Sequence, residues 1–229
     1  MIKKQGHGIR GMRGGRPDGM EGKGMVYDFT VLMALVDYLP VLFYGIAAVL
    51  LIKEFYGKMR PGAFVCFAAG ATDVFTAGFL KATWKLLYAT GACDFEALNS
   101  LFMPLQSVGF LLAGVGILLY VCTGKKEKSA AAMAVVPPVF GGTFVFIAMM
   151  VAGLGAVNAG LSILAARRKK GLAILFFALC FVCSMGMGYL ASRDSASAAV
   201  NWIEQTVNCV GQGCLLMGVL IMRKGGKNA

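Results

Sequence analysis

The stretch ALNSLFMPLQSVGFLLAGVGIL at residues 97–118 recurs as AVNWIEQTVNCVGQGCLLMGVL at residues 199–220, with no gap between the two copies. The positions that agree include an asparagine and two glycines: Asn99 and Asn201, Gly109 and Gly211, Gly116 and Gly218. Both copies lie in apolar runs of membrane-spanning length. The match predicts one ancestral unit that was duplicated and fused, and it directs the search for function to the interface between the copies.

The composition around these copies is that of a membrane protein. Hydrophobic residues make up 58% of the chain and charged residues 14%, whereas soluble domains are roughly 45–50% apolar. Six segments approach the ~20 apolar residues that a spanning helix needs, and they cover residues 29–52, 62–80, 99–122, 143–166, 171–191 and 200–222. The runs are continuous, without the alternation of a barrel strand. The sequence therefore predicts an all-α membrane protein with six transmembrane helices.

The repeat divides the chain into parts. They are a disordered, basic, glycine-rich tail (1–25), a first three-helix repeat (26–124), a linker (125–142), a second three-helix repeat (143–224) and a short tail (225–229). Three spans per copy make the second copy enter the membrane from the opposite face, so an inverted repeat is predicted. A seventh span within 129–166 would make the copies parallel instead, but about 38 residues is short for two spans and a turn.

The net charge of +11 comes from Lys and Arg at the ends of the apolar runs and in the first tail. This placement is typical of contacts with anionic membrane lipids, and no compact basic module indicates a nucleic-acid partner. Counting the tail, more Lys and Arg fall on the cytoplasmic side when both termini lie in the cytoplasm. The sequence therefore predicts a protein of the cytoplasmic membrane with both termini inside, although the bias nearly vanishes without the tail.

Several kinds of chemistry have no support in the sequence. His7 is the one histidine and lies in the tail, which argues against histidine-based catalysis and most zinc or haem sites. No glycine-rich loop ends in Lys-Ser or Lys-Thr, so no nucleotide-binding loop is predicted. We expect no cofactor, no metal and no enzyme activity. Homo-oligomers are compatible with the sequence, but nothing in it indicates one.

Polar residues inside the apolar runs form the candidate site. Measured from the ends of the runs, Asp37 and Asp73 lie roughly 11–14 Å from the same membrane boundary, and Gln106 and Asn158 reach the same level. Asn208, the repeat mate of Gln106, belongs to a polar stripe on the last run. Buried carboxylates are costly in lipid and usually face the bundle interior, and two in one dry site would share a proton. The pattern predicts a binding site for a small solute, a proton or a cation.

Two functions agree best with this pattern, and a lipid-modifying enzyme acting through Asp37 and Asp73 agrees least, because no nucleophile or metal cluster accompanies them in the sequence. The first is a small-solute or ion transporter whose intramembrane carboxylates couple movement to protons or cations. The second is a membrane scaffold or accessory subunit, in which the polar residues only hold helices together. Lys81 and Lys85, near Trp84 and Tyr88, are interpreted as interfacial anchors, and the basic cluster at residues 167–170 as a lipid-facing one.

Overall fold

The computed structural model describes residues 30–123, 143–191 and 198–224. These residues form α-helices only, which in chain order are α1 (Val31–Val36), α2 (Tyr38–Phe55), α3 (Pro61–Ala89), α4 (Glu96–Ser100), α5 (Phe102–Thr123), α6 (Thr143–Arg167), α7 (Gly171–Ala191) and α8 (Ala198–Arg223). The predictions of a disordered first tail, a linker at 125–142 and a short last tail fall outside the described residues.

Six helical segments are long and apolar enough to cross a membrane, as the sequence predicts. The first consists of α1 and α2 together, and the third of α4 and α5. The second span differs most from its prediction, because α3 continues to Ala89 although the apolar run ends at residue 80. The all-α, multi-pass character of the protein is thus confirmed for the described residues.

The first span is interrupted at Asp37, between α1 and α2. Pro40 lies in the first turn of α2, where its ring has no N–H to donate to the carbonyl of Val36. Before the break, Thr30 caps α1 by accepting a hydrogen bond from the Met33 N–H at 3.2 Å. The break places the Asp37 carboxylate at a helix junction inside the span.

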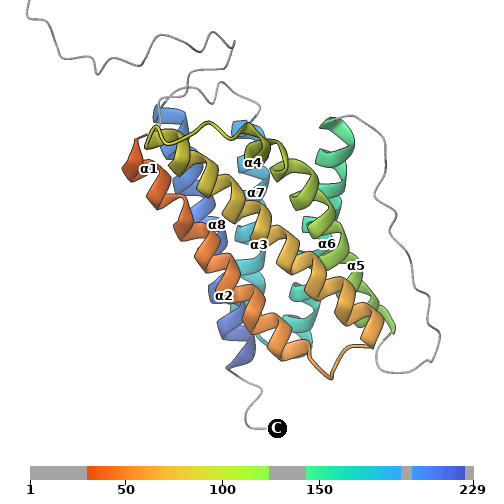
Figure 1. Cartoon of the computed structure of the whole chain (residues 1–229). Helices are drawn as coiled ribbons and strands as arrows, with labels where there is room; N and C mark the ends of the chain where they lie inside the picture. The colour runs from red at the N-terminus through yellow and green to blue at the C-terminus, as the bar shows by residue number, and fades with distance from the viewer. Residues whose placement is uncertain (1–29, 124–142, 192–197, 225–229) are drawn as a thin grey trace, which may run out of the picture.

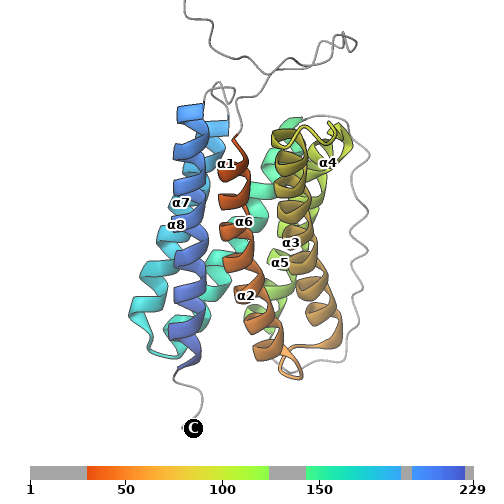
Figure 2. The ribbon, with the colours of Figure 1, turned by 60° about the vertical axis from the view of Figure 1, so that its left-hand side comes forward.

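The spanning helices form a ring in chain order (Figures 1 and 2). From α2 the ring runs through α3, α5, α6 and α7 to α8, and α8 packs back against α2. Figure 2 shows this closure, with α8 in blue standing beside α2 in orange. We call α1–α5 the first half and α6–α8 the second half, so the halves meet at two seams, α5–α6 and α2–α8.

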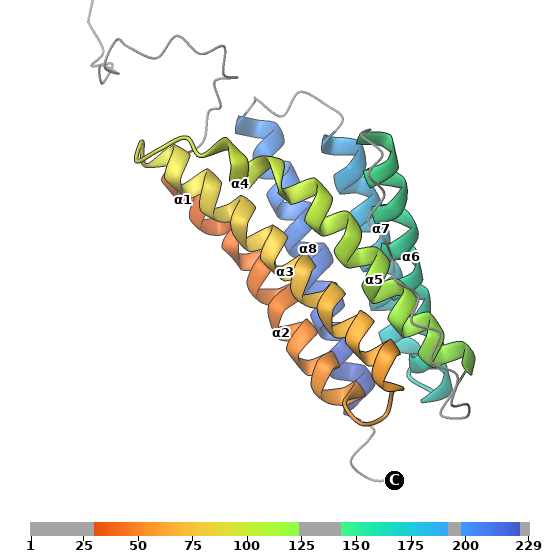
Figure 3. The same ribbon diagram turned by 45° about the vertical axis from the view of Figure 1, so that its right-hand side comes forward.

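Both seams join helices that run in the same direction. At the α5–α6 seam, Gly153 lies against Phe110 and Gly160 against Ile117, so the residue numbers rise together. The α2–α8 seam begins at α1, which belongs to the same span as α2: there the Gln205 side chain donates a hydrogen bond to the Met33 carbonyl. Further along the same seam Arg223 pairs with Glu54. The two halves are therefore parallel, and Figure 3 shows α5 and α6 descending side by side.

This arrangement corrects the inverted repeat predicted from the sequence. That prediction assumed that the chain between the copies stays on one side of the membrane. The Arg167 guanidinium at the end of α6 donates to the Val121 carbonyl at the end of α5, at 3.0 Å, so these two helix ends lie together. The start of α6 lies at the other end of the bundle (Figure 1). A single helix, α6, fills 143–167, and the segment at 124–142 lies outside the described residues.

We call the two ends of the bundle the α1 end, where α1 begins, and the basic end, where α2, α5, α6 and α8 finish. The start of α1 and the end of α8 lie at opposite ends (Figure 1). The described helices therefore do not support the predicted placement of both termini on one side of the membrane. The terminal residues themselves are outside the described part.

The half of the bundle nearer the basic end has a filled apolar core. Side chains from all six spans meet there with little or no exposed surface, among them Phe55, Phe67, Ile117, Leu161, Phe177 and Val219. At its centre is a cavity of about 20 Å³ with an apolar lining, next to Tyr44 and Leu215. Apolar cavities of this kind stay dry. A cavity of this size and lining is not a water-filled path through the ring.

Candidate functional site

Asp37 forms a buried ion pair with Lys85, at 2.9 Å between Oδ2 and Nζ. The two side chains are only 13% and 8% exposed. The antiparallel packing of α2 and α3 brings them together, as it brings the Tyr38 hydroxyl to within 3.0 Å of Thr83 Oγ1. Lys85, interpreted from the sequence as an interfacial anchor, is thus an interior residue. An ion pair of this kind costs desolvation energy, and charged residues inside spans usually mark a functional site.

Further polar side chains surround this pair. Lys81, one turn before Lys85 on α3, lies 4.0 Å above the centre of the Phe102 ring, a cation–π contact. The charges of Asp37, Lys85 and Glu204 all act on Lys81. We call Asp37, Lys81, Lys85, Glu204 and Gln205 the polar cluster.

The second half contributes Glu204 and Gln205 to the polar cluster, from neighbouring positions on α8. Gln205 is 3% exposed, and its Nε2 donates to the Met33 carbonyl at 3.0 Å. The Oε1 atoms of both residues are buried and have no hydrogen-bond partner among the described residues. Each such oxygen can accept a hydrogen bond that the described residues do not supply.

The two carboxylates predicted to share a site do not converge. Asp73 lies 12 residues before Lys85, the partner of Asp37, which is about 18 Å along α3. It is half-buried and makes no hydrogen bond or ion pair within the described part, although its charge reaches the Tyr44 hydroxyl. The predicted pairing of Asp37 with Asp73 is therefore wrong.

The three predicted amides lie at different levels. By the packing of α2 against α8, Asn208 lies near the level of Asp37, and its Oδ1 accepts from Gln212 at 3.5 Å. By the packing of α3 against α5, Gln106 lies near the level of Asp73, with a buried and unpartnered Oε1. Asn158 donates to the Leu154 carbonyl of its own helix at 2.9 Å, while its Oδ1 has no described partner. The single plane predicted for Asp37, Asp73, Gln106 and Asn158 does not form.

Sequence reasoning missed a second charged group, at the basic end. The Glu54 carboxylate pairs with Lys58 at 2.6 Å, with Arg168 at 3.0 Å and with Arg223 at 3.5 Å. The Arg168 guanidinium also donates to the Met222 carbonyl at 3.4 Å. One carboxylate thus joins the end of α2 to the α6–α7 turn and to the end of α8, which links the two halves.

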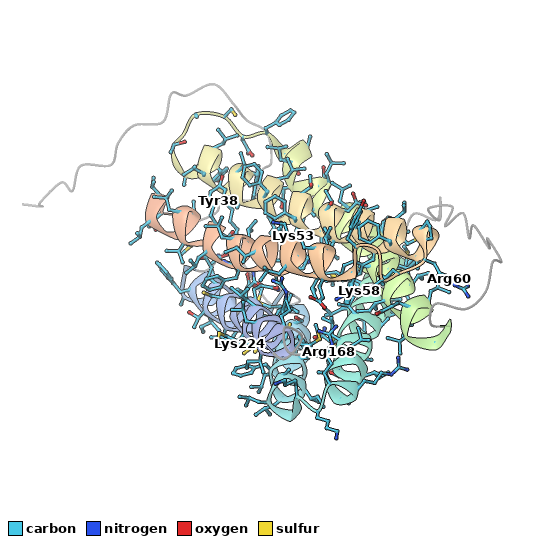
Figure 4. All side chains as sticks on the ribbon, turned by 90° about the horizontal axis from the view of Figure 1, so that it is seen from below. Tyr38, Lys53, Lys58, Arg60, Arg168 and Lys224 are labelled. Atoms are coloured by element: carbon cyan, nitrogen blue, oxygen red, sulfur yellow. The ribbon has the colours of Figure 1, made fainter. Side chains whose placement is uncertain are left out.

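Cations dominate the basic end. Among the described residues it carries one acid, Glu54, and the following cations: Lys53, Lys58, Arg60, Arg167, Arg168, Lys169, Lys170, Arg223 and Lys224. Figure 4 looks onto this end and labels several of them, with Tyr38 at the far end of the bundle. The α1 end has the opposite balance, with Lys81 and Lys85 against four described acids (Asp37, Asp94, Glu96 and Glu204).

In the described part of the chain, no three His, Cys, Asp or Glu side chains group as a metal site would require. The cysteines described there are free thiols. Comparison with known proteins adds no family to this geometry: no protein-family model, no curated protein and no solved structure matches the chain.

Proposed function

We propose that the protein is a transporter of a small polar solute or ion, and that the polar cluster is its binding site. One observation carries the proposal: both halves send polar side chains into the interior near the α1 end, directly above an apolar core. Asp37 and Lys85 come from the first half, and Gln205 from the second. The buried oxygens of Glu204 and Gln205 offer unused acceptors there. A binding site between two membrane repeats is the common plan of secondary transporters.

The two seams suggest how such a transporter would move. At the α5–α6 seam the backbones of the two helices touch at Gly114 and Gly153, and the Ile117 side chain packs onto Gly160, so this seam is closely packed. The α2–α8 seam instead carries ionic and polar contacts, from Gln205 at one end to Arg223 at the other. We infer that the halves rock about the α5–α6 seam while the α2–α8 seam opens. In that scheme the Glu54 ion pairs close the basic end.

Transport can be tested by removing one acceptor of the polar cluster. We expect Gln205→Leu to reduce uptake to the level of empty liposomes. Folding should stay intact, because the Met33 carbonyl still accepts a hydrogen bond from the Asp37 N–H when the bond from Gln205 is lost. The assay presents purified protein in liposomes with a defined mixture of amino acids, sugars and alkali cations. Mass spectrometry then measures which of them accumulate.

The matched control is Thr206→Val, at the next position on α8. Thr206 is exposed, and its hydroxyl bonds only the carbonyl of Trp202 one turn earlier. We expect this variant to transport as the unmodified protein does. Uptake that survives Gln205→Leu, or liposomes that accumulate none of the mixture with the unmodified protein, would contradict the proposed function.

We further propose that the basic end faces the cytoplasm of the cell membrane, because cations gather on the cytoplasmic flanks of spans. Cys93, exposed beyond the end of α3, then lies outside, and Tyr56, which is 74% exposed in the α2–α3 turn, lies inside. On intact cells we expect a membrane-impermeant maleimide to label Cys93 and to leave Tyr56→Cys unlabelled in a Cys93→Ser, Cys122→Ser background, since Cys122 is also exposed at the basic end. Permeabilised cells should label both, and the reverse pattern would show the opposite orientation.

The second candidate function is a scaffold or accessory subunit. It is favoured by the Asp37–Lys85 contact, because a carboxylate that is already neutralised can hold helices together without binding a solute. The dry apolar core agrees with this role as well. A protein whose stability depends on the ion pair, and which transports nothing, would fit the scaffold.

A further inference from the structure

The outer face of the α2–α3 pair has an apolar groove of about 410 Å³. Leu42, Ile46 and Val49 of α2 line one side, and Thr72 and Phe75 of α3 line the other. Leu42, Ile46 and Val49 are at least half exposed, so the groove opens outward, where the hydrocarbon of a membrane would lie. Its volume falls within the range of small-ligand sites.

Small residues explain why the groove exists. Ala48 and Ala71 lie at its base, and Gly45 leaves space into which the edge of the Phe75 ring fits. The groove begins at Leu42 and ends at Ile52, so it extends about 15 Å along α2 toward the basic end. It therefore has the length and direction of an acyl chain that hangs from the leaflet at that end.

A positively charged side chain, that of Lys53, lies at the basic end of the groove. Lys53 directly follows the last lining residue, Ile52, and continues the exposed stripe of Leu42, Ile46 and Val49 by helical spacing. Lys53 is exposed and has no ion pair among the described residues, while nearby Lys58 is held by Glu54. Figure 4, which looks onto the basic end, labels Lys53 as well as Lys58 and Arg168.

We propose that this groove binds an anionic phospholipid, with an acyl chain between α2 and α3 and the headgroup phosphate at Lys53. Along the exposed stripe of α2, three apolar residues are followed by one cation, Lys53. This order favours a lipid over a second copy of the chain as the occupant of the groove. A helix packed along the stripe would bury the Lys53 ammonium and would need an acid opposite it. A phospholipid supplies the apolar chain and the negative charge in that same order.

The test is native mass spectrometry of the full-length protein with phosphatidylglycerol or with phosphatidylcholine of the same acyl chains. We expect one phosphatidylglycerol to be retained in preference to phosphatidylcholine. Lys53→Gln should weaken phosphatidylglycerol binding about fivefold, since a cation near the headgroups contributes about 1 kcal/mol. Val49→Trp should fill the groove and remove both lipids.

Two controls separate this site from general lipid contact. Lys224→Gln removes an exposed cation at the same end, and Val182→Trp enlarges a valine that is 64% exposed on α7. Both should retain phosphatidylglycerol as the unmodified protein does. Equal retention of the two lipids, no effect of Lys53→Gln, or a dimer that appears as lipid is removed would each overturn the proposal, and the dimer would assign the groove to a second copy.

Discussion

Replacing Asp37 with alanine is expected to lower the free energy of unfolding by about 3–5 kcal/mol, because the change removes the carboxylate that pairs with the buried Lys85 ammonium. Lys85 has an 8% exposed side chain and cannot regain water without distorting α3. The measurement is chemical unfolding in detergent or nanodiscs. Asp73→Ala is the matched control, because Asp73 is half-buried on the same hairpin and has no ion pair there. We expect that control to change stability by less than about 1 kcal/mol.

The double variant Asp37→Leu with Lys85→Met then separates stability from function. Replacing both charges with apolar groups of similar size should restore most of the lost stability. If the polar cluster binds the solute, the restored protein should still fail to transport. Full transport by the double variant would show that the pair only holds helices together. An Asp37→Ala protein as stable as the unmodified one would show that the pair contributes little to folding.

Replacing Gly153 with alanine is expected to break the α5–α6 seam. A Cβ at this position would overlap the backbone of Phe110 and Leu111 on the neighbouring helix, and backbone cannot turn aside as a side chain can. We expect the free energy of unfolding to fall by about 1–3 kcal/mol, the usual cost of overpacking a close contact.

Gly155 provides the control, two residues along the same helix. A Cβ there would meet only the edge of the Phe181 ring, at 3.7 Å, which is an ordinary contact. Gly155→Ala should therefore be neutral or slightly stabilising, since alanine favours helix over glycine by about 1 kcal/mol. Equal effects of the two substitutions would show that the seam is looser than its geometry indicates.

The six spans could be predicted from the sequence because each consists of a long apolar run. The end of α3 could not be predicted in the same way. The run stops at Lys81, but the helix continues, since Lys81 and Lys85 turn into the bundle and meet Phe102 and Asp37. A hydropathy profile ends an apolar run at a lysine, even where the lysine side chain pairs with a residue in the interior of the bundle.

The same error misplaced the candidate site. Depths measured from the ends of apolar runs put Asp37 level with Asp73, whereas the α2–α3 turn sets the real register. The turn spans residues 56–60, and antiparallel helices joined there place Phe55 against Phe67 and Tyr38 against Thr83. Counting outward from the turn would have placed Asp37 opposite Lys85. The direction of the second half could not be found by counting from a turn, because no short turn joins α5 to α6.

The parallel order of the halves bears on how the chain enters the membrane. In each half, the first hairpin has its turn at the basic end, with Lys58 and Arg60 in one and Arg168 and Lys169 in the other. Each turn therefore carries its own topogenic signal, and both signals point to the same compartment. During synthesis the second hairpin need not inherit its orientation from the first, so insertion errors in one half need not propagate to the other.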